Sequence, residues 1–302
     1  MMAVTTQPQG GPGQVDLREP RSWRRTRNQL ATVLMALSFV VVIVPLGFVL
    51  VTVIAKGASI ISWHFLTGSI VPNVLPANFG GMGPAIVGTL EITALATVIA
   101  VPLGVLGAIY INEYGGRGIL ARVVRFMSDV MTGVPSIIMG LFIFTLWTLH
   151  FQYSGLGGAL ALACLMLPIV IRSSEEMLKL VPDSLRQGSY ALGASKARVT
   201  MTVVLPAALG GIVSGALLAV ARAAGETAPL LFTIGIVTSV NRNVFSGATT
   251  SLPSQIFLNA SQPYTGAQAR GWGAALTLVV IAFIVMIAAR LVTARFAKYS
   301  PS

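Results

Sequence analysis

Arg222 and Glu226 carry opposite charges inside a long apolar stretch of about residues 203 to 240. Their four-residue spacing predicts that the two side chains share one helical face. A charge inside a membrane span costs at least about 2.5 to 3.5 kcal/mol on insertion scales, so such side chains normally face a bundle interior or a wet path. The planar guanidinium of Arg222 matches an oxyanion such as phosphate in a bidentate manner, and the hydroxyl of Thr227 adds a further donor.

The role of Glu226 has two interpretations, which the residues alone leave open. In one, its carboxylate weakens the hold of Arg222 on the anion, because a lone buried cation would bind the anion too tightly to release it. In the other, the two side chains pair with each other and fix their helix against its neighbours. Gly225 and Pro229 predict a break at this point, because the stretch is too long for one ordinary span.

A second pattern lies in a polar segment, residues 183 to 206, that precedes the charged pair. Asp183 follows a proline and is placed to cap a short helix. Gly193 would end that helix, because glycine adopts backbone angles that other residues resist, and a second short helix would follow before Pro206. Such an element could dock on another protein and transmit force, whereas periodicity alone is also typical of an ordinary amphipathic surface helix.

The spacing of this segment resembles the coupling-loop signature of ABC importer permeases, which reads Glu-Ala-Ala, three residues, Gly, nine residues, Ile, one residue, Leu-Pro. Gln187 stands in place of the usual acid, and the other two triplet residues depart from alanine. The stretch ARAAGETAP from Ala221 to Pro229 is similar to the phosphate-specific permeases of the PstA type. The resemblance implies a set of residues that couple to an ATPase: Gln187, Gly188, Ser189, Gly193, Ala194, Leu205 and Pro206.

The resemblance also implies the partners of the chain. They are a sister permease of the PstC type, a pair of nucleotide-binding ATPase subunits and an extracytoplasmic phosphate-binding protein. The sequence contains no Gly-x-x-x-x-Gly-Lys-Ser/Thr loop, which cradles nucleotide phosphates. We therefore expect a transport subunit rather than an enzyme, with ATP and magnesium on the partner subunits and no cofactor on this chain.

The composition identifies an integral membrane protein. Hydrophobic residues make up 55% of the chain and charged residues only 10%, against roughly one quarter charged in soluble domains. The net charge of +11 could suggest nucleic acid, but the basic residues fall between apolar spans rather than on one basic face beside aromatics. We expect membrane lipid as the surroundings and no nucleic acid as a partner.

Basic clusters between the spans predict the topology, because lysine and arginine accumulate in cytoplasmic loops. The clusters place residues 1–29, 111–125, 172–205 and 293–302 inside. Residues 1–29 form a basic tail that we expect to be disordered, residues 30–292 form the permease domain, and residues 293–302 form a second tail. Six helices are expected, at about residues 30–55, 86–110, 126–149, 159–171, from Pro206 onward, and 271–291.

The prediction is an all-α integral membrane protein of the bacterial plasma (inner) membrane, with the type I ABC importer permease fold and both termini cytoplasmic. Its function would be phosphate import. A permease for another oxyanion, molybdate or sulfate, is the first alternative, because only the GETAP segment argues for phosphate. A secondary transporter or channel that needs no ATPase is the second alternative.

Overall fold

The computed structural model describes residues 23–71, 80–116 and 118–297. The chain divides into two units, residues 1–51 and residues 52–302, which we describe separately. The predicted tail of residues 1–29 lies outside the described residues as far as residue 22. Its last part was predicted wrongly, because residues from Trp23 onward already belong to a helix. Arginine and glutamine are good helix formers, so a basic flank can extend an apolar helix.

Every named element of the described residues is helical, and an isolated bridge joins Ser154 to Gly247. Elements labelled η are π-helical turns. The elements, in chain order, are α1 (Trp23–Gly57), α2 (Trp63–Thr67), α3 (Gly83–Ile109), η1 (Tyr110–Tyr114), α4 (Ile119–Gly133), α5 (Ser136–Ile143), η2 (Phe144–Thr148), α6 (Leu149–Phe151), α7 (Gly155–Lys179), α8 (Asp183–Ala191), α9 (Lys196–Val199), η3 (Thr200–Val204), α10 (Leu205–Ala224), α11 (Ala228–Thr233), α12 (Leu252–Ala260) and α13 (Thr265–Ala297).

Five helical stretches of the described residues are long and apolar enough to cross a membrane, and a bent pair of helices makes a sixth. The stretches are Arg25–Gly57, Gly83–Tyr114, Gly155–Lys179, Lys196–Ala224 and Thr265–Ala288, and the bent pair is Ile119–Gly133 with Ser136–Phe151. The predicted all-α membrane fold is confirmed, and the spans number six when the bent pair is counted as one. The expected cytoplasmic location of both termini stays a prediction.

The third span begins earlier than predicted and is sharply broken. It starts at Ile119 instead of about residue 126, and its two halves meet at an angle of 109°. Pro135 explains the break, because proline disfavours the helical conformation in the residue before it. Val134 accordingly has φ −75° and ψ 129°, an extended conformation.

The fourth and fifth spans are both longer than predicted. α7 runs to Lys179 and therefore includes charged residues that were assigned to a cytoplasmic loop from residue 172. The fifth span begins at Lys196 rather than near Pro206, because η3 joins α9 to α10 without a break. Pro206 has no backbone N–H, and in η3 the ladder shifts by one residue, so that the Leu205 N–H bonds the Thr200 carbonyl.

The sixth helix was also placed too late and too short. α13 runs from Thr265 to Ala297, whereas about residues 271–291 were expected. The predicted C-terminal tail of residues 293–302 is therefore helical as far as Ala297, and residues 298–302 lie outside the described residues.

The core of the second unit lies where α3, α7 and α10 meet. It is built mainly from small apolar side chains: Ala96, Ala100, Ala159, Ala163, Ala219 and Ala223, with Ile92, Leu162, Met166 and Val170. α10 approaches α7 closely at Gly211 and Gly215, because a Cβ atom at either position would clash with Met177 or Ser173 of α7. Small residues let two membrane helices approach closely, so α10 is held firmly against α7.

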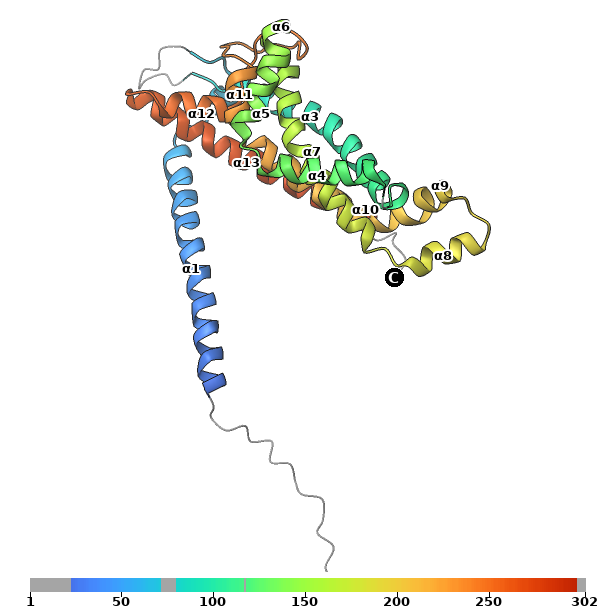
Figure 1. The fold of residues 1–302 in the computed structure, drawn as a ribbon. Coiled ribbons are helices and arrows are strands. Elements are labelled where there is room, and N and C mark those ends of the chain that lie inside the picture. Colours follow the sequence, from blue (N-terminus) through green and yellow to red (C-terminus); the bar gives the residue numbers. More distant parts are fainter. Residues whose placement is uncertain (1–22, 72–79, 117, 298–302) are drawn as a thin grey trace, which may run out of the picture. The chain divides into compact units, whose positions relative to one another are not determined.

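Two groups of short helices lie at opposite ends of this unit. Figure 1 shows α8 and α9 at one end, beyond the ends of α3 and α7, and α6, α11 and α12 at the other. The long helices connect the two ends. A site on α10 or α11 can therefore be linked to α8 only through the α3, α7 and α10 core.

Candidate functional site

Arg222 lies in the last turn of α10, with its Nε atom 3.7 Å from the Oε1 atom of Glu226. This separation is an ion pair but exceeds the range of a hydrogen bond. The Arg222 side chain is 64% exposed and the Glu226 side chain 19%. Within the described parts of the chain no hydrogen bond uses the Arg222 guanidinium, so its donors remain available to an anion.

Glu226 meets Arg222 across a turn rather than along a helix, which corrects the prediction of a shared helical face. α10 ends at Ala224, and the backbone N–H of Glu226 donates to the carbonyl of Ala223 at 3.1 Å. The predicted break at Gly225 and Pro229 is confirmed. Glycine and a proline that cannot donate a helical hydrogen bond together stop the span and begin α11.

On the side that faces α7, the pair of Arg222 and Glu226 borders a very small cavity. Leu165, Met166 and Ile169 line it, together with Arg222 and Glu226, and its volume is about 10 Å³. One water needs roughly this volume, so an oxyanion does not fit there. An anion at Arg222 must therefore approach from the exposed side of α10.

Thr227 precedes α11, and its side chain is half-buried beside Glu226. Its hydroxyl does not cap α11, and it makes no hydrogen bond to any residue that the structure describes. The three residues predicted to handle the anion therefore lie around one break in the helix, with a cation, a carboxylate and a hydroxyl that has no partner in the described residues.

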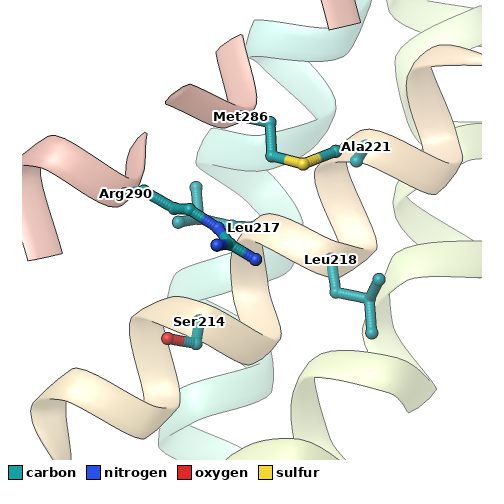
Figure 2. A pocket seen from close by; sticks show the side chains of 6 residues that line it. All are labelled: Ser214, Leu217, Leu218, Ala221, Met286 and Arg290. Atoms are coloured by element: carbon teal, nitrogen blue, oxygen red, sulfur yellow. The ribbon is translucent and has the colours of Figure 1, made fainter. Parts of the chain in front are cut away.

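A pocket of about 340 Å³ between α10 and α13 brings a second arginine, Arg290 of α13, beside α10. Figure 2 shows the Arg290 side chain reaching from α13 to α10, where its guanidinium lies beside Leu217 and near Ser214. The Ser214 hydroxyl donates to the Gly210 carbonyl at 2.8 Å. Arg290 is the charged residue among those that line the pocket. Ser214 precedes Arg222 by eight residues, about 12 Å along a helix.

The predicted coupling segment forms α8 and α9, as expected, and α8 has no buried residue. Gln187 and Gly188 are exposed on α8, and the Ser189 hydroxyl donates to the Leu185 carbonyl at 2.8 Å. Leu192, directly after the helix, is 90% exposed. Leu185 and Tyr190 of α8 are exposed too, and a group of exposed apolar side chains can mark a surface that another protein covers.

Gly193 ends α8 in the manner that the sequence predicts. Its φ angle is +80°. The Gly193 N–H donates to the Tyr190 carbonyl at 2.9 Å, and the Ala194 N–H donates to the Ser189 carbonyl at 3.2 Å. This pair of bonds is the Schellman motif, in which glycine at the left-handed position closes the helix.

The remaining coupling residues lie on the body of the unit. Ala194 and Leu205 pack against a core that includes Leu178 and Val199. Pro206 is exposed in the first turn of α10. The structure therefore divides the predicted set into exposed residues on α8 and residues that hold the following helix in place.

Two charged clusters near α8 were not predicted. Buried Glu175 of α7 accepts Arg125 Nε and Lys179 Nζ, both at 2.7 Å, and Arg172 NH1 lies 3.7 Å away. Glu113 of η1 accepts Arg186 NH2 at 3.0 Å. The spacings within α7 could have shown part of the first cluster, but the sequence gives no signal for partners 50 or 73 residues apart.

Comparison with known proteins gives the family. Residues 100–298 match the family described as "Binding-protein-dependent transport system inner membrane component". The phosphate transport system permease protein PstA 1 of Mycobacterium tuberculosis (strain ATCC 25618 / H37Rv) is 46% identical over 277 residues, which covers 89% of this chain and 88% of the relative. The chain belongs to the PstA family of ABC importer permeases. The PstA protein of Yersinia pestis is 39% identical over 283 residues, with coverage of 92% and 94%.

Solved structures of ABC importers share the fold. A bacterial alginate ABC transporter gives a TM-score of 0.65 at 14% identity, with coverage of 92% of this chain and 99% of the other. The MetNI methionine ABC transporter gives 0.54 at 19% identity, with coverage of 72% and 94%. These identities show the fold alone. This PstA-family chain is thus a multi-pass inner-membrane protein with the type I ABC importer permease fold.

Proposed function

We propose that this chain is the transmembrane permease subunit of an ATP-driven importer of inorganic phosphate and forms half of the translocation path. The proposal rests on family membership and on one structural observation, the available guanidinium of Arg222 at the break between α10 and α11. Relatives of the chain are named phosphate transport system permeases. Guanidinium donors match phosphate geometry bidentately.

In this proposal Arg222 binds the passing anion, Glu226 keeps the binding weak, and Thr227 adds a hydroxyl donor. Arg290 supplies a further cation along α10. A purely structural pair would hold α10 against its neighbours. The loose 3.7 Å separation and the exposure of Arg222 favour the anion-binding role instead.

The exposed side of Arg222 needs a second protein surface to enclose the anion, because the chain itself leaves space for only about one water at the pair. A sister permease of the PstC type would supply that surface. An extracytoplasmic phosphate-binding protein would deliver the anion, and lipid would surround the remaining apolar faces of the helices.

The exposed surface of α8 would dock on a nucleotide-binding subunit, with Gln187, Gly188, Ser189 and Gly193 at the contact. Ala194, Leu205 and Pro206 would connect this contact to the body of the unit. In this division of labour ATP and magnesium bind to the ATPase subunits. The chain itself carries the path and catalyses no reaction.

Uptake by the reconstituted transporter tests the function. Proteoliposomes that contain both permeases and the ATPase subunits, with the binding protein outside and ATP inside, should accumulate labelled phosphate. Unlabelled molybdate or sulfate in excess should leave this uptake unchanged. Accumulation of molybdate or sulfate with no accumulation of phosphate would assign a different substrate.

A further inference from the structure

Arg186 is the residue of α8 that reaches most deeply into the body of the unit. Its side chain is 13% exposed, although α8 as a whole buries no residue. Its Nη1 atom donates to the Val181 carbonyl, and to Asp183 Oδ1 at 3.1 Å. Its Nη2 atom donates to the Leu178 carbonyl at 2.9 Å and to Glu113 Oε1 at 3.0 Å.

These partners belong to two different elements beyond α8. Leu178 lies in the last turn of α7, where carbonyls lack the usual intrahelical donors, and Val181 lies two residues beyond the end of that helix. Glu113 lies in η1, which continues α3. Arginine carries five N–H donors in a rigid fork, and the bonds to Leu178 and Glu113 bind α8 to α7 and η1 at once.

No other side chain of α8 makes a comparable link in the described residues. The Ser189 hydroxyl donates within α8 and the Asp183 carboxylate accepts only from Arg186. Apart from its approach to α9 and η3, the remaining connection of α8 to the body runs along the chain, through Pro182 on one side and the Gly193 turn on the other. Without Arg186, α8 could therefore pivot between these two points.

We propose that Arg186 is a positioning residue, paired with Glu113, that transmits movement of α8 to the packed α3 and α7 helices. This role rests on the proposed function, in which α8 docks on an ATPase subunit. α3 and α7 share the core that includes Ile92, Ala96, Leu162 and Met166. α7 in turn contributes Leu165 and Ile169 to the space beside Arg222.

The pair is suited to this task because both side chains are largely buried, at the edge of a polar pocket of about 420 Å³ that they help to line. The Glu113 side chain is only 5% exposed, so the interaction is screened less by salt than a surface ion pair. A lysine at position 186 would keep the charge but not the fork. It could satisfy Glu113 while releasing some of the carbonyls at the end of α7.

The test is the number of phosphate ions imported per ATP hydrolysed by the complete reconstituted transporter. In Arg186→Ala we expect the ATPase subunits to stay bound and ATP hydrolysis to continue, while this ratio falls about ten-fold or more. Arg186→Lys and Glu113→Gln should give intermediate ratios. Hydrogen exchange of α8 in the assembled complex should accelerate in all three variants, because the link that restrains the helix is weakened.

Arg242→Ala is the matched control, because it removes an exposed arginine from the loop between α11 and α12. Its ratio should equal that of the unchanged protein. An Arg186→Ala complex that assembles and keeps the original ratio overturns the proposal. If that variant does not assemble, an unchanged ratio in Glu113→Gln overturns it.

The experiment distinguishes an error in the role proposed for Arg186 from an error in the assignment of phosphate as the substrate. If the unchanged transporter imports another oxyanion instead of phosphate, the substrate assignment is wrong. The ratio is then measured with that anion, and the comparison between Arg186→Ala and Arg242→Ala still decides the role of Arg186.

Discussion

Glu175 of α7 accepts a hydrogen bond from Arg125 of α4, with Oε1 2.7 Å from Nε, and so ties the third span to the fourth. The Glu175 side chain is 1% exposed, and Lys179 and Arg172 also lie within ion-pair distance. One buried carboxylate thus faces three cations at the same end of the unit. Its second oxygen, Oε2, has no hydrogen-bond partner in the described structure.

Removing the Glu175 carboxylate should destabilise the protein. Leaving a fully buried charge without its partner costs about 3 to 5 kcal/mol, and the cost here should be lower because the remaining side chains of Arg125, Arg172 and Lys179 are 32%, 44% and 51% exposed. We expect Glu175→Ala to lower the unfolding temperature of the purified complex markedly. The neighbouring Glu176 is exposed, so Glu176→Ala is the matched control and should change the unfolding temperature little. Equal effects of the two substitutions would contradict this account of Glu175.

Replacing Gly193 should strain the end of α8. Its φ angle is +80°, where a side chain costs roughly 1 to 2 kcal/mol. Gly193→Ala should therefore speed hydrogen exchange in α8, and the bulkier Gly193→Glu should also reduce ATPase association and phosphate uptake. Gly188→Ala is the control within α8: a Cβ there meets no atom within 4 Å, so this change should slow hydrogen exchange. Normal ATPase association and phosphate uptake in Gly193→Glu would contradict the docking role.

A double substitution distinguishes anion binding by Arg222 from a purely structural pairing of Arg222 with Glu226. If the pair only stabilises the fold, Arg222→Gln with Glu226→Gln should restore what either single change loses, because no unpaired charge remains. If Arg222 binds the anion, the double variant should assemble with its ATPase subunits and stay inactive. Arg222→Lys should recover uptake only in part, since lysine lacks the forked donors. Normal uptake in the double variant would defeat the proposed role.

Cysteine labelling should establish the orientation in the membrane. Ser184 is exposed on α8, and Ser246 is exposed in the loop that joins α11 to α12, two helices at the other end of the unit in Figure 1. In a Cys164→Ala background, Ser246→Cys should react in intact cells with an impermeant reagent and Ser184→Cys should not, because basic clusters favour the cytoplasmic side. The reverse result would invert the predicted topology.

Hydropathy predicted which segments form spans, because each must bury an apolar surface in lipid. It did not predict where the spans end. α7 continues to Lys179 because its charged residues pair with one another and with Arg125, so charge there did not mark a loop. Likewise Pro206 suggested a helix start, whereas η3 passes the chain through that position without a break.

In the candidate site, features that depend on neighbouring residues could be predicted from the sequence, but contacts between distant residues could not. Gly193 and the Gly225 and Pro229 break follow from backbone chemistry, so local sequence was sufficient. The contact of Arg186 with Glu113 joins residues 73 positions apart. No local pattern specifies that contact, since it depends on where η1 and the end of α7 meet after folding.

The π-helical turn η3 affects how this chain is aligned with related sequences. A π turn closes its hydrogen bonds over one more residue than an α turn, so the faces of α9 and α10 are out of step by one residue. A helical wheel drawn with a single period from Lys196 to Ala224 therefore assigns residues on one side of η3 to the wrong face. A relative that lacks this turn should align only with a one-residue gap inside the continuous helix, even though no loop is present there.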